Sequence, residues 1–138
     1  MDGQSVTMIT AMISGKMPMV PDMKIGMVDV RDVARLHVKA MTVDGAAGRR
    51  FIAASAEPVD MVTVARVLQK AGFTKVSSLR APTLLLKAVG LFDREVRGML
   101  PFIGKAASLD NAATINVLQW RPTPIETSFR EMAEAISP

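Results

Sequence analysis

Apolar residues recur every three to four positions in several parts of the chain, a spacing that predicts helices with one buried face. The first predicted helix begins at Ser5 as its N-cap and ends near Gly15, with Ile9 and Met12 on its apolar face. The next segment, "MPMVPDM", contains two prolines, which interrupt regular structure. It is therefore predicted to be an ordered loop.

The segment "VDVRDVARLHVKAM" has the features of a capped helix. Asp29 stands in an N-cap position, and Asp32 follows in the first turn, where a carboxylate favours the helix dipole. The predicted apolar face comprises Val33, Leu36, His37, Ala40 and Met41. The helix is expected to end at the turn residues of "VDGAAG".

Four further helices are predicted towards the C-terminus. Their expected ranges are 60–70, with Asp60 as the cap, 82–100, with a kink at Gly90, a short helix capped by Asp110, and 125–136. Proline is favoured in the first turn of a helix, as at Pro82, and glycine is favoured after the last turn.

Three short apolar segments predict strands: "KIGMV" at 24–28, "RRFIAAS" at 49–55 and "TKVSSLR" at 74–80. Strands that alternate with helices favour an α/β fold with some parallel pairing. Three short strands are few for a complete sheet. The sequence therefore predicts an incomplete α/β unit, a part of a larger fold.

Composition narrows the functional classes. The 138 residues suit one domain, and the absence of cysteine excludes disulfides, zinc–thiolate sites and thiol catalysis. The net charge is +4, but the basic residues are dispersed, and five Phe, one Trp and no Tyr offer little for base stacking. We therefore expect no nucleic-acid partner. The apolar runs are too short to span a bilayer, and the start lacks a basic signal region, so we expect a cytoplasmic protein without a membrane partner.

The cluster of Asp29, Asp32 and His37 raises the question of acid–base chemistry. A Ser–His–Asp arrangement would need the histidine to face a carboxylate. The spacing instead places His37 on the apolar face of the helix, so we expect a buried, hydrogen-bonded histidine. The two aspartates are expected to act as a cap and a first-turn acid, with Asp32 paired to Arg35 at i,i+3. No phosphate-binding glycine motif is present.

Four motifs in the same order resemble one family. Its pattern V-x-V-x-D-V-A-x-x-H, followed by G-x-R/x-F/Y-I, is matched by Val28, Val30, Asp32, Val33, Ala34, His37, Gly48, Arg50, Phe51 and Ile52. "SGKMPMVPD", "APTLLLKAVGLFDREVRGMLPFIGK" and "SLDNAATINVLQWRPTPIETS" match its loop, its C-terminal helical segment and its D-x-x-K-A-x-x-x-L-G-W-x-P ending. The chain resembles the C-terminal part of an extended short-chain dehydrogenase/reductase, of the dihydroflavonol-4-reductase-like type within the NAD-dependent epimerase/dehydratase family. It departs from the pattern at Gln119, where glycine is common, and near Thr114, where a basic residue is common.

The resemblance implies an extended Rossmann-type fold, of which residues 1–138 would be one C-terminal, substrate-side domain with the late elements of the nucleotide-binding sheet. The family's glycine motif and its Ser and Tyr-x-x-x-Lys catalytic set lie upstream of the matched region. Catalytic and cofactor-binding residues are therefore expected to be absent here. The intact enzyme would use NAD(P), and this chain alone is expected to bind no cofactor and to be inactive.

The resemblance also bears on the substrate. Nucleotide-sugar members carry arginines, which bind diphosphate oxygens bidentately, at the positions matched by Ile25 and Thr83. Their replacement favours a small or aromatic ketone or aldehyde. Pro21, Ile25, Gly26 and Thr83 are the predicted substrate wall, although each is also explained by plain packing. The alternative is a non-catalytic interaction module that oligomerises through the surfaces of the half-fold, and we expect a homo-oligomer.

Overall fold

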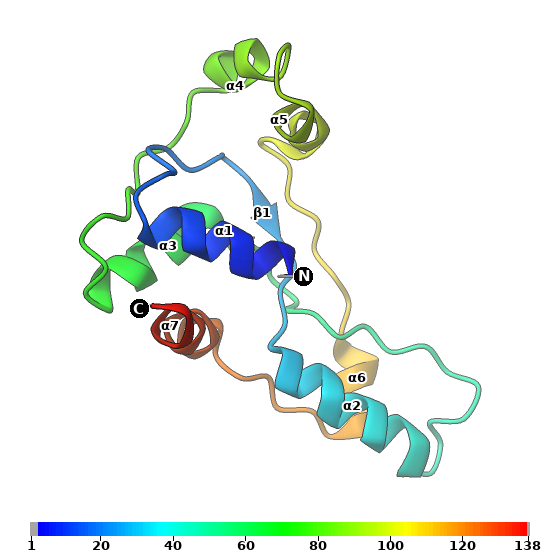
Figure 1. The fold of residues 1–138 in the computed structure, drawn as a ribbon. Coiled ribbons are helices and arrows are strands. Elements are labelled where there is room, and N and C mark those ends of the chain that lie inside the picture. The colour runs from blue at the N-terminus through cyan, green and yellow to red at the C-terminus, as the bar shows by residue number, and fades with distance from the viewer. Residues whose placement is uncertain (1–2, 138) are drawn as a thin grey trace.

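The computed structural model describes residues 3–137, so residues 1, 2 and 138 of the predicted 1–138 unit lie outside it. Figure 1 shows a helix-rich chain in three parts: a central layer, an arm above it and a lobe below it. The elements are α1 (Gln4–Ile13), β1 (Lys24–Ile25), α2 (Val30–Thr42), β2 (Val59–Asp60), α3 (Met61–Lys70), α4 (Thr83–Val89), α5 (Arg94–Met99), the 3-10 helix η1 (Leu100–Phe102), α6 (Ala112–Leu118) and α7 (Ile125–Ile136).

The chain is mixed α/β, but the prediction of three strands with parallel pairing is wrong. In the described part, β1 and β2 form a two-stranded antiparallel sheet, in which Lys24 faces Asp60 and Ile25 faces Val59. Segment 49–55 is irregular, with a bend at Ala54 and no strand partner, and segment 74–80 contributes only a parallel bridge from Arg80 to Val20. A strand requires a neighbour to complete its hydrogen bonds, so apolar sequence alone does not create one.

The central layer holds the larger hydrophobic core. Helix α7 packs against both α1 and α3, and α3 also contacts β2 of the small sheet (Figure 1). The fully buried side chains at their centre include Ile9, Met12, Val64 and Leu68. The prediction that Ile9 and Met12 face inward is confirmed, as is the inward face of the helix that Asp60 caps. The Asp60 carboxylate accepts a hydrogen bond from the Val62 N–H at 2.9 Å.

The second core is smaller and lies in what we call the α2–α6 lobe, which comprises α2, residues 43–55, α6 and residues 119–123. Its buried apolar residues are Leu36, Ala46, Leu118 and Trp120. Helix α2 packs against α6 across this cluster. The Thr114 hydroxyl donates to the Ile52 carbonyl, and the Asn111 amide donates to the Ala54 carbonyl, so α6 and its N-cap anchor segment 49–55.

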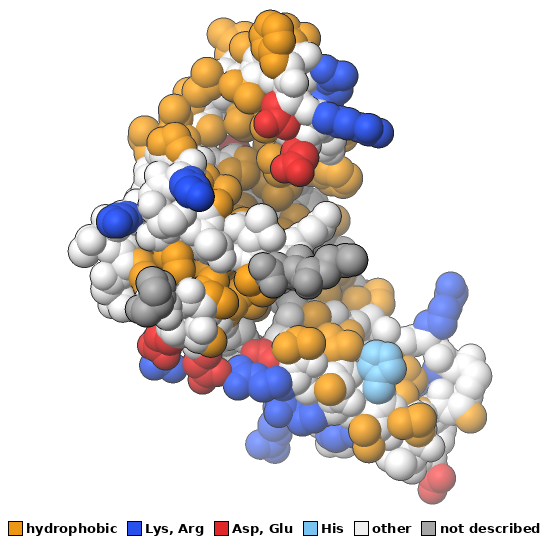
Figure 2. All heavy atoms as spheres, in the orientation of Figure 1, with side chains coloured by type: hydrophobic (Ala, Val, Ile, Leu, Met, Phe, Trp, Pro, Cys, Tyr) orange, Lys and Arg blue, Asp and Glu red, His pale blue; other side chains and the backbone are white. Residues whose placement is uncertain are grey.

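The arm consists of α4, α5 and η1. The single helix predicted for 82–100 is wrong, because α4 ends at Gly90 and Asp93 caps a new helix by accepting from the Glu95 and Val96 N–H groups. A Cβ at Gly90 would lie 3.1 Å from a Leu100 methyl carbon, so glycine permits the close approach of η1. Figure 2 shows hydrophobic side chains over the top of this arm.

Two predicted helix starts need correction. Ser5 lies inside α1, whose N-cap is Gly3, and no side chain caps that helix. Asp110 precedes Asn111, the N-cap of α6, but its carboxylate accepts from the Ala112 N–H at 3.0 Å, so it still serves the first turn. None of the helices within residues 3–137 is both long and apolar enough to cross a bilayer.

Candidate functional site

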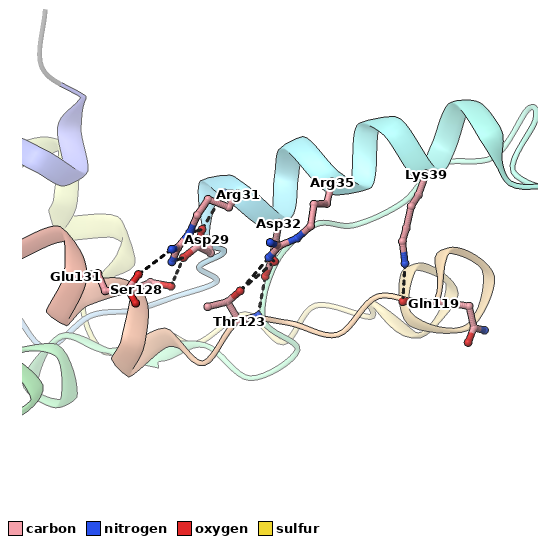
Figure 3. A network of polar contacts seen from close by, with 9 residues as sticks. All are labelled: Asp29, Arg31, Asp32, Arg35, Lys39, Gln119, Thr123, Ser128 and Glu131. Carbon is pink, nitrogen blue, oxygen red and sulfur yellow. Dashed lines mark hydrogen bonds and ion pairs between the residues drawn. The ribbon is translucent and has the colours of Figure 1, made fainter.

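A dense network of hydrogen bonds and ion pairs lies at the N-terminus of α2 (Figure 3). Asp29 is the N-cap, as predicted, and accepts from the Arg31 backbone N–H at 2.8 Å. The same carboxylate accepts from Arg31 Nε and Nη2 and from the Ser128 hydroxyl of α7. Arg31 Nη1 also lies 2.8 Å from Glu131 Oε2. This network therefore joins the start of α2 to α7, across the boundary between the lobe and the central layer.

Asp32 anchors the second half of the network. Its side chain is 1% exposed and pairs with Arg35, as the i,i+3 spacing predicts. It also accepts from the Thr123 N–H at 2.7 Å and from the Thr123 hydroxyl at 3.1 Å. No local pattern predicts the Thr123 and Ser128 contacts, because these residues lie 91 and 99 positions away from their aspartates.

The electrostatics exclude these aspartates as proton-transfer groups near neutral pH. The Arg31 guanidinium holds the pKa of Asp29 well below its usual range, and Asp29 raises the pKa of Arg31 in turn. Burial acts to raise the pKa of Asp32, but the hydrogen bonds from Thr123 and Arg35 outweigh it and lower that pKa. A general acid or base works best with a pKa near the working pH. Both carboxylates instead remain ionised and structural.

The prediction of a buried His37 is wrong. Its ring is exposed on the side of α2 that faces away from α6, and Nδ1 donates to the Val33 carbonyl at 2.8 Å. Within residues 3–137 no carboxylate bonds to this ring, so His37 completes no triad there. The helical period correctly grouped His37 with Met41, but both lie on an uncovered face.

The four predicted substrate-wall residues have different environments. Pro21 is buried, Ile25 packs against the central core, and Thr83 is exposed at the first position of α4. Gly26 approaches the 105–111 segment closely, since a Cβ there would lie 2.7 Å from Leu109 Cδ1.

The pairing of Val20 with residues 79–81 brings the loop of Pro21 towards the start of α4. Pro21 and Thr83 therefore belong to neighbouring segments, whereas Ile25 and Gly26 continue from β1. Packing alone also explains each of the four positions. None of them lines either of the two clefts on the surface.

Two shallow clefts occur elsewhere on the surface. The first, of about 220 Å³, is lined by Arg35, Leu36, Lys39, Gln119, Trp120 and Arg121. The second, of about 310 Å³, is lined by Val67, Lys70, Ala71, Glu126, Thr127 and Arg130 between α3 and α7. Sequence reasoning missed both, because each combines residues from two distant segments. The i,i+4 spacing of Arg35 and Lys39 was the only local signal.

The described residues hold no group of three or more His, Asp or Glu side chains suited to a metal ion. Comparison with known proteins adds no assignment: no protein-family model matches the chain, and no curated protein matches it. The geometry and the sequence therefore carry the functional argument.

Proposed function

We propose that this chain is the C-terminal, substrate-side part of an NAD(P)-dependent reductase of the extended short-chain dehydrogenase/reductase type. The intact enzyme reduces a small or aromatic ketone or aldehyde, and the chain alone is inactive. The order of the four motifs suggested this class. The physical support comes from the α2–α6 lobe, where backbone groups without hydrogen-bond partners and exposed apolar side chains resemble those of a protein interior.

The observation that carries the proposal is the backbone of segment 50–54, which forms neither helix nor strand. The carbonyls of Ile52 and Ala54 accept from α6, as described above. The backbone groups of Phe51 and Ala53 have no hydrogen-bond partner within residues 3–137. Two carbonyls of this segment are therefore anchored, whereas Phe51 and Ala53 keep open backbone groups that a neighbouring strand would complete.

The neighbouring helix supports the same reading. Val30, Val38 and Met41 are 78%, 57% and 77% exposed, and their spacing places them on one face of α2. Apolar residues scattered singly on a surface need no explanation, but a continuous helical face marks a contact. Open backbone groups and an uncovered helix face within one lobe are expected where the remainder of a larger sheet packs.

The test is to express the chain together with the coding sequence immediately upstream and to measure NAD(P)H oxidation with aliphatic and aromatic carbonyl compounds. We expect activity from the extended protein and none from residues 1–138. NADPH oxidation by purified 1–138 would contradict the proposal. So would an upstream sequence without a glycine-rich βαβ unit and a Tyr-x-x-x-Lys motif in frame.

The predicted substrate wall has its own test in the extended protein. Thr83 is exposed, so Thr83→Arg should leave folding intact while it raises KM for the carbonyl substrate several-fold. Thr74→Arg, at an exposed position after α3, is the matched control and should leave KM unchanged. Equal KM values for both variants would remove Thr83 from the wall.

A second candidate function, self-association as a non-catalytic module, is favoured by the arm. Phe92 and Leu84 are 93% and 81% exposed, and Leu91 lies between them in sequence with most of its side chain exposed. Surfaces of this kind drive association. Sedimentation at micromolar concentration should detect an oligomer that Phe92→Glu weakens. A stable monomer would rule this candidate out.

A further inference from the structure

The first of the two clefts has a charge arrangement that neither the motifs nor the reductase proposal explains. Arg35 and Lys39 stand one turn apart on α2, and Arg121 follows α6. Like charges at i,i+4 repel each other and destabilise a helix. No acidic residue lines the cleft. Figure 2 shows Lys and Arg side chains gathered along this edge of α2.

The nearby carboxylate of Asp32 offsets only one of the three positive charges. Asp32 is buried and already accepts from Thr123, and it engages Arg35 through Nη2 alone. Among residues 3–137, Arg35 Nε and Nη1 have no hydrogen-bond partner, and the Arg121 side chain has none at all. Five N–H groups on each guanidinium are built to meet oxygen acceptors. The cleft therefore holds donors and positive charge in excess of the acceptors that face them.

The floor of the cleft is held rigidly. Lys39 Nζ donates to the carbonyls of Leu118 and Gln119, at 2.8 Å each, which fixes the ammonium over the C-terminus of α6 (Figure 3). Gln119 adopts φ 48°, the only positive φ of a non-glycine residue in the described chain. Such strain in a non-glycine residue persists where the surroundings hold it, and it is frequent at ligand sites.

The turn at Gln119 is followed by Trp120, which lines the cleft. The Trp120 side chain is buried, and its indole N–H has no acceptor within the described residues. A buried donor without a partner is costly, and native structures usually satisfy it. This nitrogen is closed off from the surface, so the N–H marks incomplete packing beside the cleft and does not itself face a ligand there. The positive charge and the free guanidinium donors of the cleft both call for an acceptor ligand.

We propose that the cleft between α2 and the residue 119–121 turn binds a compact tetrahedral oxyanion, namely a phosphate group. Arginine and lysine together form the usual protein partners of phosphate. The volume of about 220 Å³ admits a phosphate group, but it lies below the range of about 300–1,000 Å³ that accommodates larger organic ligands. The phosphate is therefore either free or the terminal group of a larger molecule. This site is independent of the proposed reductase activity.

The chain contains its own reporter, because Trp120 is the only tryptophan and there is no tyrosine. Intrinsic fluorescence of residues 1–138 is titrated with inorganic phosphate at constant ionic strength, with potassium chloride as the reference. We expect a saturable change with phosphate and none with chloride. A second titration uses vesicles that contain phosphatidic acid. A response to vesicles without a response to inorganic phosphate assigns the phosphate to a lipid headgroup.

Arg121→Gln tests the site directly, since this side chain has no partner within the described residues whose loss would disturb folding. We expect its affinity for the responding probe to fall at least about tenfold, as befits loss of a charge-assisted contact. Arg94→Gln, an exposed arginine on α5, is the matched control and should retain the full response. Circular dichroism verifies that both variants are folded.

Two results would overturn the proposal. The first is the absence of a saturable response to both inorganic phosphate and the vesicles. The second is a saturable response that Arg121→Gln leaves unchanged.

Discussion

The central layer and the α2–α6 lobe are held together by different forces. The central core is a large set of fully buried apolar side chains from three helices, whereas the lobe has a much smaller apolar cluster. Polar contacts partly compensate for the smaller apolar core of the lobe. Asp29 contacts Ser128 of α7, and Asp32 contacts Thr123. The central layer thus has the character of an independently stable core, and the lobe that of a unit completed by contacts from elsewhere.

The largest expected effect tests the central core. Leu68 is completely buried, so Leu68→Ala removes packed methyl groups and leaves a cavity, at a cost of about 2–5 kcal/mol in the free energy of unfolding. Urea denaturation followed by circular dichroism measures it. Leu84→Ala, at an exposed position of α4, should change stability by less than about 0.5 kcal/mol. Similar costs at the two sites would mean that the central layer is not the stable part.

The next effect tests whether polar contacts hold the lobe. Asp32→Ala leaves the Thr123 N–H without its acceptor, and we expect a loss of about 1–3 kcal/mol. Hydrogen exchange should show faster exchange in α2 and α6 than in α3. Asp44→Ala, an exposed carboxylate beyond the end of α2, is the control and should leave exchange unchanged. Uniform acceleration over the whole chain would contradict a separately held lobe.

The third prediction concerns pH. The folded pKa values of Asp29 and Asp32 are lowered, so their contribution to stability is present above the unfolded value of about 3.9 and is lost as the pH falls below it. Thermal unfolding between pH 7 and pH 2 should therefore show Tm falling most steeply below about pH 4. Asp29→Asn should flatten this dependence. An unchanged acid limb in that variant would show that other groups govern it.

The smallest effect compares the two faces of α2. Met41 is exposed in this chain, so Met41→Glu should change its stability by less than about 0.5 kcal/mol. In the extended protein proposed above, the same carboxylate would be buried, and a cost of about 1–3 kcal/mol is expected. Thr63→Glu, at an exposed position of α3, should be neutral in both proteins. Equal effects of Met41→Glu in the two proteins would mean that nothing covers this face.

These contrasts show how far the sequence could predict the fold. The caps at Asp29 and Asp60 and the inward faces of α1 and α3 were correct, because caps and amphipathic faces depend on residues within a few positions of each other. The predictions of strands at 49–55 and 74–80 were wrong, because a strand needs a neighbouring strand that the local sequence pattern does not contain. The prediction that His37 is buried was wrong for the same reason. Helical periodicity shows which residues share a face, but not whether another element covers that face.

By itself the sequence determined the approximate positions of most helices, the caps at Asp29 and Asp60, the i,i+3 pairing of Asp32 with Arg35 and the absence of tyrosine and cysteine. Only the tertiary structure decided that Asp29 and Asp32 contact α7 and Thr123, that Arg121 joins Arg35 and Lys39 at one cleft, and that one face of α2 is uncovered. The physical reason is the range of each interaction. Helical hydrogen bonds join near neighbours in sequence, whereas these contacts join residues that only packing brings together.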